Sequence, residues 1–345
     1  MGYVICVSFV SSFITITHTN NTDSIPILIM YLYKEYGDIS IVREAYDATK
    51  RWIRFLEMAS IDQVENGLSD WMNVETGGNV RRLTGHIFAY MNFQSFCEMA
   101  LLVGDNATAV ECAKNAQDIK QYMNAHFLNA NDGTYTDNST FNLTQCGQSM
   151  PLFRNLVPEN LRDNVLSKLY ESLGTPKHLL VGMFCMEPLL SSLNVSTAYE
   201  VAITRSTYPS FGNMLIQNAT TVWESWFYSN NTYSHNHPMF GGGLVSWMIR
   251  DLAGIRQRDW SVGYSHLWFR PRSPCTIPKN DTFDGIEVVL NSPIRGNISS
   301  SWSLSEKSFE FLVPPGSVAD VDLPDRDTYS VGPGSYMVNN IAWCI

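Results

Sequence analysis

The sequence predicts a mainly α-helical chain that ends in a small antiparallel β-sandwich. From about residue 26 to 255, apolar residues recur at helical spacing, in segments separated by short polar turns. After about Gly263, apolar and polar residues alternate instead, as they do along half-buried strands. The chain has 345 residues, of which 45% are hydrophobic and 16% charged, so it can bury a large core and does not belong to the disordered class.

A long antiparallel helical hairpin is the clearest element of the first part. One helix runs roughly from Thr84 to Val103, and the Gly104-Asp105-Asn106 turn leads into a second. In this second helix, apolar residues recur every three or four positions and predict one buried stripe, with charged residues facing water. The stripe consists of Ala109, Cys112, Ala113, Ala116, Ile119, Met123 and Phe127.

The same periodicity predicts further helices before and after this hairpin. Pro158 stands where a proline in the first helical turn is tolerated, and Leu161, Val165 and Leu169 mark the buried face that follows. Helical hairpins must bury their apolar stripes against one another, so they stack as a solenoid or close as an α/α toroid. The remaining expected helices span residues 27–36, 41–59, 158–172, 179–191, 196–204 and 239–254.

Three strands follow in the last part of the chain, separated by proline-containing turns. Their inward positions are expected to be Ile298, Trp302 and Leu304, then Phe309, Phe311 and Val313, then Ala319, Val321 and Leu323. Cys275 and Cys344 lie at opposite ends of this region and could form a disulfide that joins its termini, although sequence alone does not fix disulfide connectivity.

Charge and cysteine spacing exclude several classes of function. The net charge of -10 comes without a clustered basic face, so nucleic acid is not an expected partner. The seven cysteines are widely spaced and form no CxxC pair, so a zinc site is not indicated. No glycine-rich phosphate loop or EF-hand loop is present, so no cofactor is expected, while a structural calcium ion bound by loop carboxylates stays open.

Asn-x-Ser/Thr sequons are dense and favour an extracellular or lysosome-like secretory location; the alternative is that an Asn- and Thr-rich chain produces them by chance. The segment from Met1 to Thr17 is apolar but has no Lys or Arg, which makes it a weak signal peptide. Serines and threonines interrupt it, so no membrane span is expected. The sequons start at Asn20, Asn106, Asn138, Asn142, Asn194, Asn218, Asn230, Asn280 and Asn297.

The densest cluster of residues able to do chemistry runs from Thr220 to Trp226. It places Glu224 between Trp223 and Trp226, and His235-Asn236-His237 follows shortly afterwards. Indole faces pack against the C–H faces of a sugar ring, and an ionised carboxylate can take a proton from water. The alternative is that both tryptophans are core residues at helical spacing and that Glu224 is a surface charge.

This cluster and its neighbours resemble glycoside hydrolase family 78, the α-L-rhamnosidases. The resemblance covers roughly residues 25 to 340 and rests on several segments in the same order. They are Tyr31–Asp38, Gly174–Gly182 with His178, Tyr208-Pro209-Ser210-Phe211-Gly212, Thr220-Thr221-Val222-Trp223-Glu224-Ser225-Trp226, Asn236-His237, Met239–Ile255, Trp302 and Gly332-Pro333-Gly334-Ser335-Tyr336.

The resemblance implies an inverting glycosidase that removes terminal α-L-rhamnose from a rhamnose-containing oligosaccharide or glycoside. It implies that Glu224 is the general base, that His237 contacts the sugar, and that Asp70 and Trp71 line the sugar pocket beside Trp223 and Trp226. The fold it implies is an incomplete (α/α)6 barrel over residues 25–262, after an atypical apolar segment over 1–24, with a β-sandwich domain over 263–345.

Two departures from the family limit this interpretation. Ser69 stands before Asp70-Trp71 where the family carries glycine, so the local turn could differ, and Asp70 could equally be a cap or turn residue. For His86 and His178, a hydrogen-bonded core histidine is the expected role.

The second departure concerns the general acid. In the family this acid lies in an acidic segment, and nothing like it precedes Ile25, so we expect a truncated chain with impaired activity. The alternatives are an inactive rhamnose-binding protein and an (α/α)6-barrel glycosidase for another sugar.

Overall fold

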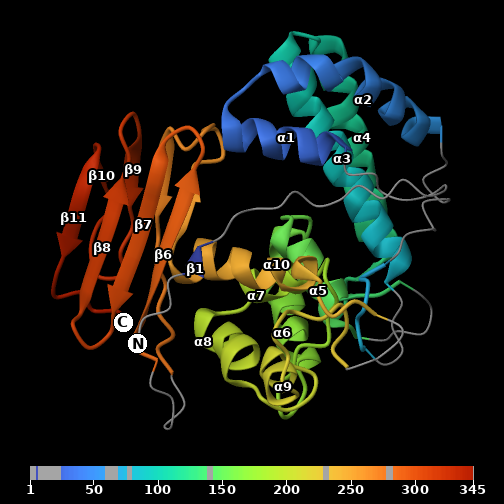
Figure 1. The fold of residues 1–345 in the computed structure, drawn as a ribbon. Coiled ribbons are helices and arrows are strands. Elements are labelled where there is room, and N and C mark those ends of the chain that lie inside the picture. Colours follow the sequence, from blue (N-terminus) through green and yellow to red (C-terminus); the bar gives the residue numbers. More distant parts are fainter. Residues whose placement is uncertain are drawn as a thin grey trace.

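The computed structural model describes residues 5–6, 25–58, 69–75, 80–137, 143–227, 233–276 and 283–344. The helices lie on one side of the molecule and the β-sheets on the other (Figure 1). This arrangement confirms the expected order of a helical domain followed by a β domain. None of the helices in the described ranges is both long and apolar enough to cross a membrane.

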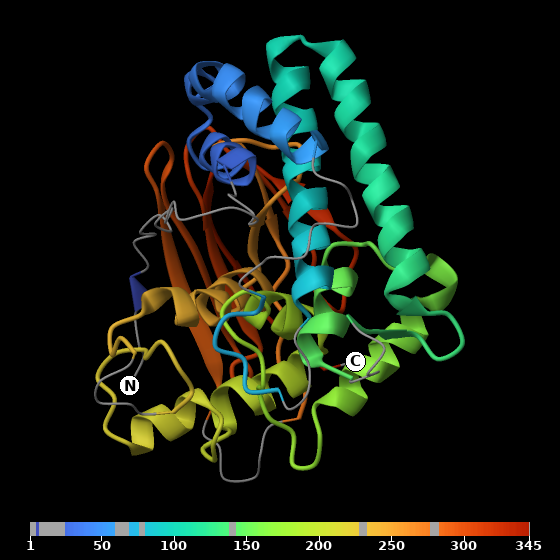
Figure 2. The ribbon, with the colours of Figure 1, turned by 90° about the vertical axis from the view of Figure 1, so that its right-hand side faces the viewer.

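Four long helices form the start of the helical domain: α1 (Ile25–Tyr36), α2 (Ser40–Met58), α3 (Arg81–Val103) and α4 (Asn106–His126). Helices α3 and α4 lie side by side, as the expected hairpin does (Figure 2). Gly104 ends α3 in a left-handed conformation, and the Asp105 side chain caps α4 by accepting from Thr108 N. The expected stripe of α4 is buried except for Ala113, which is exposed.

Shorter helices follow: α5 (Gln145–Phe153), α6 (Arg162–Ser172), α7 (Met186–Ser192), α8 (Val195–Tyr199), α9 (Phe211–Ile216) and α10 (Pro238–Trp247). A 3₁₀ turn (Glu159–Leu161) leads into α6, and π-helical turns extend α8 (Glu200–Thr204) and α10 (Met248–Leu252). The expected helix over 179–191 is wrong in its first half, since the chain becomes helical only at Met186. Helices α5 and α9 were not expected from the periodicity.

Two sheets pack face to face in the β domain. One has the order β1-β6-β7-β8-β11 and the other β10-β9-β5-β4. Phe269 of the second sheet packs against Phe309 and Phe311 of the first, with ring centroids 6.2 and 4.9 Å apart. The strands are β1 (Ile5–Cys6), β4 (Ile255–Gln257), β5 (His266–Phe269), β6 (Gly285–Ser292), β7 (Gly296–Ser303), β8 (Ser308–Val313), β9 (Val318–Val321), β10 (Tyr329–Val331) and β11 (Gly334–Val338).

The sandwich differs from the expected one in two respects. It is not wholly antiparallel, because β1 pairs with β6 and β5 with β9 in parallel. Its second sheet also includes β4, which the expected domain boundary at residue 263 leaves in the barrel. The pairing of Cys275 with Cys344 is confirmed. A further short hairpin, β2 (Leu128–Asn129) and β3 (Thr134–Tyr135), follows α4 in the helical domain.

Side chains of β7 attach the β domain to the end of the helical domain. Trp302 Nε1 donates to the Leu252 carbonyl oxygen at 2.8 Å, and Ser300 Oγ donates to the carbonyl of Ala253 at 2.5 Å. Both donors are buried, so these bonds exclude water from the junction.

Four sequon asparagines lie within the described residues, and all four are exposed. They are Asn106, Asn194, Asn218 and Asn297. The other five, Asn20, Asn138, Asn142, Asn230 and Asn280, lie outside the described residues. The exposed positions are compatible with glycan attachment, and the secretory location stays a prediction.

Candidate active site

Glu224 lies in a non-helical segment and is held by backbone and side-chain donors. Glu224 N donates to the Ser234 carbonyl oxygen, and Ser234 N donates to Glu224 Oε2, both at 2.9 Å. Trp71 Nε1 donates to Glu224 Oε1 at 3.1 Å. The Ser234 N–H is the main cause that holds the pKa of Glu224 below its usual value, with contributions from Trp71 and His237. The site therefore presents an ionised carboxylate that stays partly exposed.

Trp71 lies in a turn, in which Asn73 N donates to the Asp70 carbonyl at 3.2 Å, and this turn is hydrogen-bonded to the stretch before α7. Val74 N donates to the Leu180 carbonyl at 2.8 Å, and Met183 N donates to the Trp71 carbonyl at 3.1 Å. A Cβ atom at Gly182 would lie 1.9 Å from the Trp71 carbonyl oxygen, so only glycine permits this approach. These hydrogen bonds to Trp71 and Val74 also explain why the apolar run beginning at Leu179 is not helical.

The Asp70 carboxylate anchors this segment. It is 1% exposed and accepts hydrogen bonds from Gly182 N at 2.6 Å, Phe184 N at 3.0 Å and Cys185 N at 3.1 Å. Its oxygens are thus occupied by backbone donors, which corresponds to the structural alternative and not to a sugar ligand. Ser69 adopts a φ of 59°, a left-handed conformation that glycine takes at less cost, so the turn persists despite the substitution.

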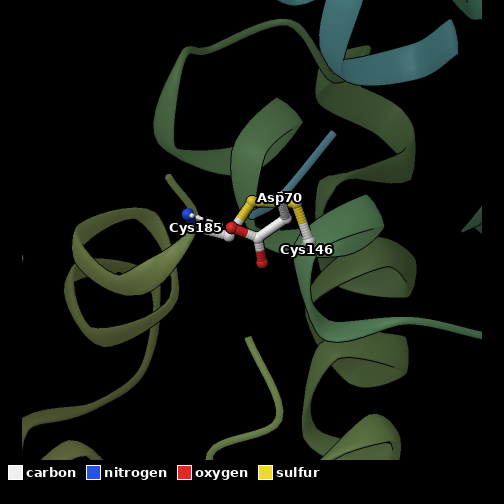
Figure 3. A group of neighbouring side chains, drawn as sticks. All are labelled: Asp70, Cys146 and Cys185. Atoms are coloured by element: carbon white, nitrogen blue, oxygen red, sulfur yellow. Dashed lines mark hydrogen bonds between the residues drawn. A yellow bond between two sulfur atoms is a disulfide. The ribbon is translucent and has the colours of Figure 1, made fainter. Parts of the chain in front are cut away.

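A disulfide lies against the Asp70 carboxylate. Cys146, at the start of α5, is bonded to Cys185, which immediately precedes α7 (Figure 3). The two sulfurs and a carboxylate oxygen lie within 4.8 Å of one another, a spacing that could suit a metal ion. Since the sulfurs are bonded to each other and the carboxylate holds three N–H groups, this set does not offer free metal ligands.

A second buried carboxylate, Glu75, lies at the end of the same segment. It accepts a hydrogen bond from Gln145 N. Burial raises the pKa of Glu75 to about 8 and that of Asp70 to about 7, and the charge of Asp70 adds to the effect on Glu75. The other oxygen of Glu75, Oε2, is buried and has no hydrogen-bond partner within the described residues.

We expect these two carboxyl groups to make the protein less stable as the pH rises from about 4 to about 8. Across this range the folded chain retains protons that the unfolded chain has lost, so deprotonation favours unfolding. Urea unfolding at about pH 5 and about pH 8 measures the difference, which Glu75→Gln should reduce. Glu310→Gln, at an exposed position of β8, is the control, and an unchanged pH dependence in Glu75→Gln would contradict the interpretation.

Both tryptophans that flank Glu224 are buried, so neither offers a ring face to a sugar in this structure. Trp226 is 0% exposed and donates from Nε1 to the Val181 carbonyl at 2.7 Å, while Phe211 and Phe240 pack at its edge. Trp223 is also buried. Their expected place in the sugar site is therefore corrected to the core, which leaves the half-buried Trp71 as the indole at the carboxylate.

His237 stands at the start of α10, on the same side of the site as Glu224. Its N–H donates to the Val222 carbonyl at 2.8 Å, and its Nδ1 accepts from Phe240 N at 3.3 Å. Because Nδ1 is engaged as the helix cap, Nε2 is the ring nitrogen available for another partner. His86 is buried with Nδ1 bonded to the Arg82 carbonyl, as expected of a core histidine. His178 has both ring nitrogens engaged but is only half-buried, so it is hydrogen-bonded as expected and not part of the core.

The chain combines a domain of helical hairpins, in which hydrogen bonds hold an ionised carboxylate, with a β-sandwich. This combination is that of the six-hairpin glycosidases. Residues 15–252 match the family model of the bacterial α-L-rhamnosidase six-hairpin glycosidase domain, and residues 254–337 match that of the bacterial α-L-rhamnosidase C-terminal domain. The chain belongs to this bacterial α-L-rhamnosidase family.

Relatives and solved structures of the family are similar to most of this chain. An α-L-rhamnosidase of Formosa agariphila is 27% identical over 87% of this chain, and one of Streptomyces avermitilis is 27% identical over 87%. The α-L-rhamnosidase structure from Dictyoglumus thermophilum matches 90% of the chain at 27% identity with a TM-score of 0.79. The matched regions make up 33%, 29% and 38% of those proteins, so the chain spans about a third of their length.

Proposed function

We propose that this chain carries the general base of an inverting α-L-rhamnosidase, and that Glu224 is that base. The observation that supports this most is the placement of its carboxylate, which Ser234 N and Trp71 Nε1 hold by one oxygen each. Two donors fix its orientation and favour its ionised form, and its partial exposure leaves room for a water molecule to approach. In single displacement, this carboxylate takes a proton from the water that attacks the anomeric carbon.

The family and the relatives support the substrate class. The two relatives compared above are α-L-rhamnosidases by name, and the Streptomyces avermitilis enzyme has been solved in complex with L-rhamnose. We assign terminal α-L-rhamnosides as the substrate, with Trp71 and His237 as the sugar contacts beside Glu224. Assay of the chain with 4-nitrophenyl glycosides tests this, since turnover of another glycoside in place of the α-L-rhamnoside would overturn it.

A sugar-binding protein without turnover is the second candidate. Inversion needs a second carboxyl group, which acts as the general acid, roughly 6.5–9.5 Å from the base. The second candidate is favoured because the two carboxylates of the segment that carries Trp71 are already engaged. Asp70 and Glu75, the two buried carboxylates described above, are both engaged by backbone N–H groups. Calorimetry with L-rhamnose separates the candidates, because heat of binding without release of nitrophenol favours the second.

Replacement of Trp71 by Phe is expected to move the acid limb of the pH–rate profile upward. The wild-type limb should lie below about pH 4.5, because hydrogen bonds lower the pKa of Glu224, and Phe removes one of these donors. We expect kcat/KM to fall by about tenfold, since a hydrogen bond to a charged group is worth about 1.5 kcal/mol or more. Trp226→Phe is the control; its buried ring donates its indole N–H to the Val181 carbonyl and not to Glu224, and an equal shift there would contradict the assignment.

A further inference from the structure

The outer face of the four-stranded sheet carries side chains that the proposed active site does not use. Along β5, Leu267 and Phe269 are buried in the sandwich core, so His266 and Trp268 point to the opposite face. Asp320 of β9 lies directly opposite Trp268 in the strand register and projects to the same side. This outer face therefore combines an indole, an imidazole and a carboxylate.

Trp260, in the turn between β4 and β5, extends this face into solvent. Its side chain is 72% exposed, and its ring packs at 68° against His266 with centroids 4.7 Å apart. A tryptophan has about 150–250 Å² of surface to bury, so this ring offers a flat apolar face that a ligand can cover. The turn is anchored to the helical domain because Gly263 N donates to the Lys34 carbonyl at 2.7 Å.

Hydrogen bonds fix the polar groups beside Trp260. Asp320 accepts from Arg258 Nε at 2.7 Å and from Ser330 Oγ at 2.6 Å, and His266 Nε2 lies 3.0 Å from the same carboxylate. The Arg258 guanidinium in turn lies over the Trp268 ring, 4.5 Å from its centroid. The side chains are thus held in place before any ligand arrives, which lowers the entropy cost of binding.

The charges on this face favour a neutral ligand. Arg258 is paired with Asp320, and two further arginines that lie over Trp268 are paired in the same way, Arg256 with Asp251 and Arg270 with Asp322. Since each guanidinium has a carboxylate partner, the face has no excess of positive charge for a phosphate or a polyanion. An exposed indole beside the partly exposed Arg258 guanidinium instead suits a sugar, whose C–H faces stack on the ring and whose hydroxyls accept from the N–H groups, while His266 supports the indole ring.

We infer that Trp260, His266 and Arg258 form a second carbohydrate-binding site, on the β domain, for a rhamnose-containing oligosaccharide. The choice of sugar rests on the proposed function, and the 6-deoxy methyl group of rhamnose adds apolar surface for an indole to cover. Such a site would bind one part of a long substrate while its terminal residue is presented to Glu224.

The test follows the indole N–H signals of the chain's nine tryptophans by NMR during titration with an α-linked L-rhamnose trisaccharide. The signal of Trp260 is identified by its loss in Trp260→Ala. Titration is done in the wild type and in Trp71→Ala, so that the two sites are read separately. We expect the Trp260 signal to shift and saturate in both, and His266→Ala to weaken this binding about tenfold, while Met337→Ala, also exposed at 57% but on the other sheet, leaves it unchanged.

A Trp260 signal that stays in place at millimolar trisaccharide overturns the inference, whether or not Trp71 responds. A signal that shifts with protein concentration alone also overturns it, since Trp260 then serves self-association. Failure of the proposed function is seen separately, as an unresponsive Trp71 signal in the wild type.

Discussion

Glu224→Gln is expected to lower the turnover of an α-L-rhamnoside by about 10²- to 10⁴-fold, the range that general-base catalysis contributes. Glutamine is close in size to glutamate, but its amide does not take a proton from water. One of its two head-group atoms can still accept from Trp71 Nε1 or Ser234 N, so the ring and the backbone should shift little. We therefore expect kcat to fall while the dissociation constant for L-rhamnose stays within a few-fold of the wild type.

Initial rates with 4-nitrophenyl α-L-rhamnoside and calorimetry with L-rhamnose measure the two quantities on the same preparations. Glu310→Gln provides a matched control, because it removes a carboxylate from an exposed position in the β domain. If Glu224→Gln turns over the substrate about as fast as the control does, Glu224 is not the general base. Loss of rhamnose binding with unchanged turnover number would assign Glu224 to binding and not to proton transfer.

The long helical hairpin could be predicted because its amphipathic pattern and its turn agree. Helix α4 alternates buried and charged residues, and the Gly104-Asp105 turn supplies both caps. Helix α5 gave no such signal because eight of its nine residues are buried, so it has no polar face to reveal its period. The helix predicted from residue 179 was wrong because a short apolar run suits either a helix or a buried non-helical segment. Hydrogen bonds between this run and residues 71 and 74 decide between the two.

The candidate residues Glu224 and Trp71 could be named from the sequence, while the groups that hold them could not. Glu224 and Trp71 are far apart in the chain, and only the fold shows that they share a hydrogen bond. Ser234 acts through its backbone N–H, which any residue other than proline supplies, so no side-chain pattern points to it. The buried state of Trp226 also depends on the tertiary packing, because an indole beside a carboxylate looks the same in a motif whether it faces a ligand or the core.

Asp70 was expected to line the sugar pocket, and the structure instead shows its carboxylate bound to backbone N–H groups. Its carboxylate accepts hydrogen bonds from the amides of residues 182, 184 and 185, and the next residue, Trp71, donates to Glu224. The chain of contacts therefore runs from the start of α7 through Asp70 and Trp71 to Glu224, the proposed general base. A substitution that displaces the amides bonded to Asp70 should therefore change the position of the Glu224 carboxylate before it unfolds the domain.

The Cys146–Cys185 disulfide is the covalent support of this arrangement, since Cys185 N is one of the three donors to Asp70. Replacing both cysteines by alanine is expected to lower the free energy of unfolding by about 4 kcal/mol, because the bond closes a loop between residues 39 positions apart and restricts the unfolded chain. Thermal unfolding measures this loss. We also expect weaker binding of L-rhamnose in the folded double variant. Without the disulfide, residue 185 is no longer fixed to α5, so the amides that orient Asp70 and Trp71 can move.

The second disulfide supplies the control for this double variant. Cys275 and Cys344 are 69 positions apart, so the same loop-closure argument gives a loss of similar size, about 4 kcal/mol. That bond lies in the β domain, and among the described residues its cysteines are hydrogen-bonded to Ser196, Ser273 and Trp343. If both double variants lose similar stability but only Cys146→Ala/Cys185→Ala loses rhamnose affinity, the first disulfide orients the site as well as stabilising the fold. Equal loss of affinity in the two variants would show that the effect on binding is a general consequence of lower stability.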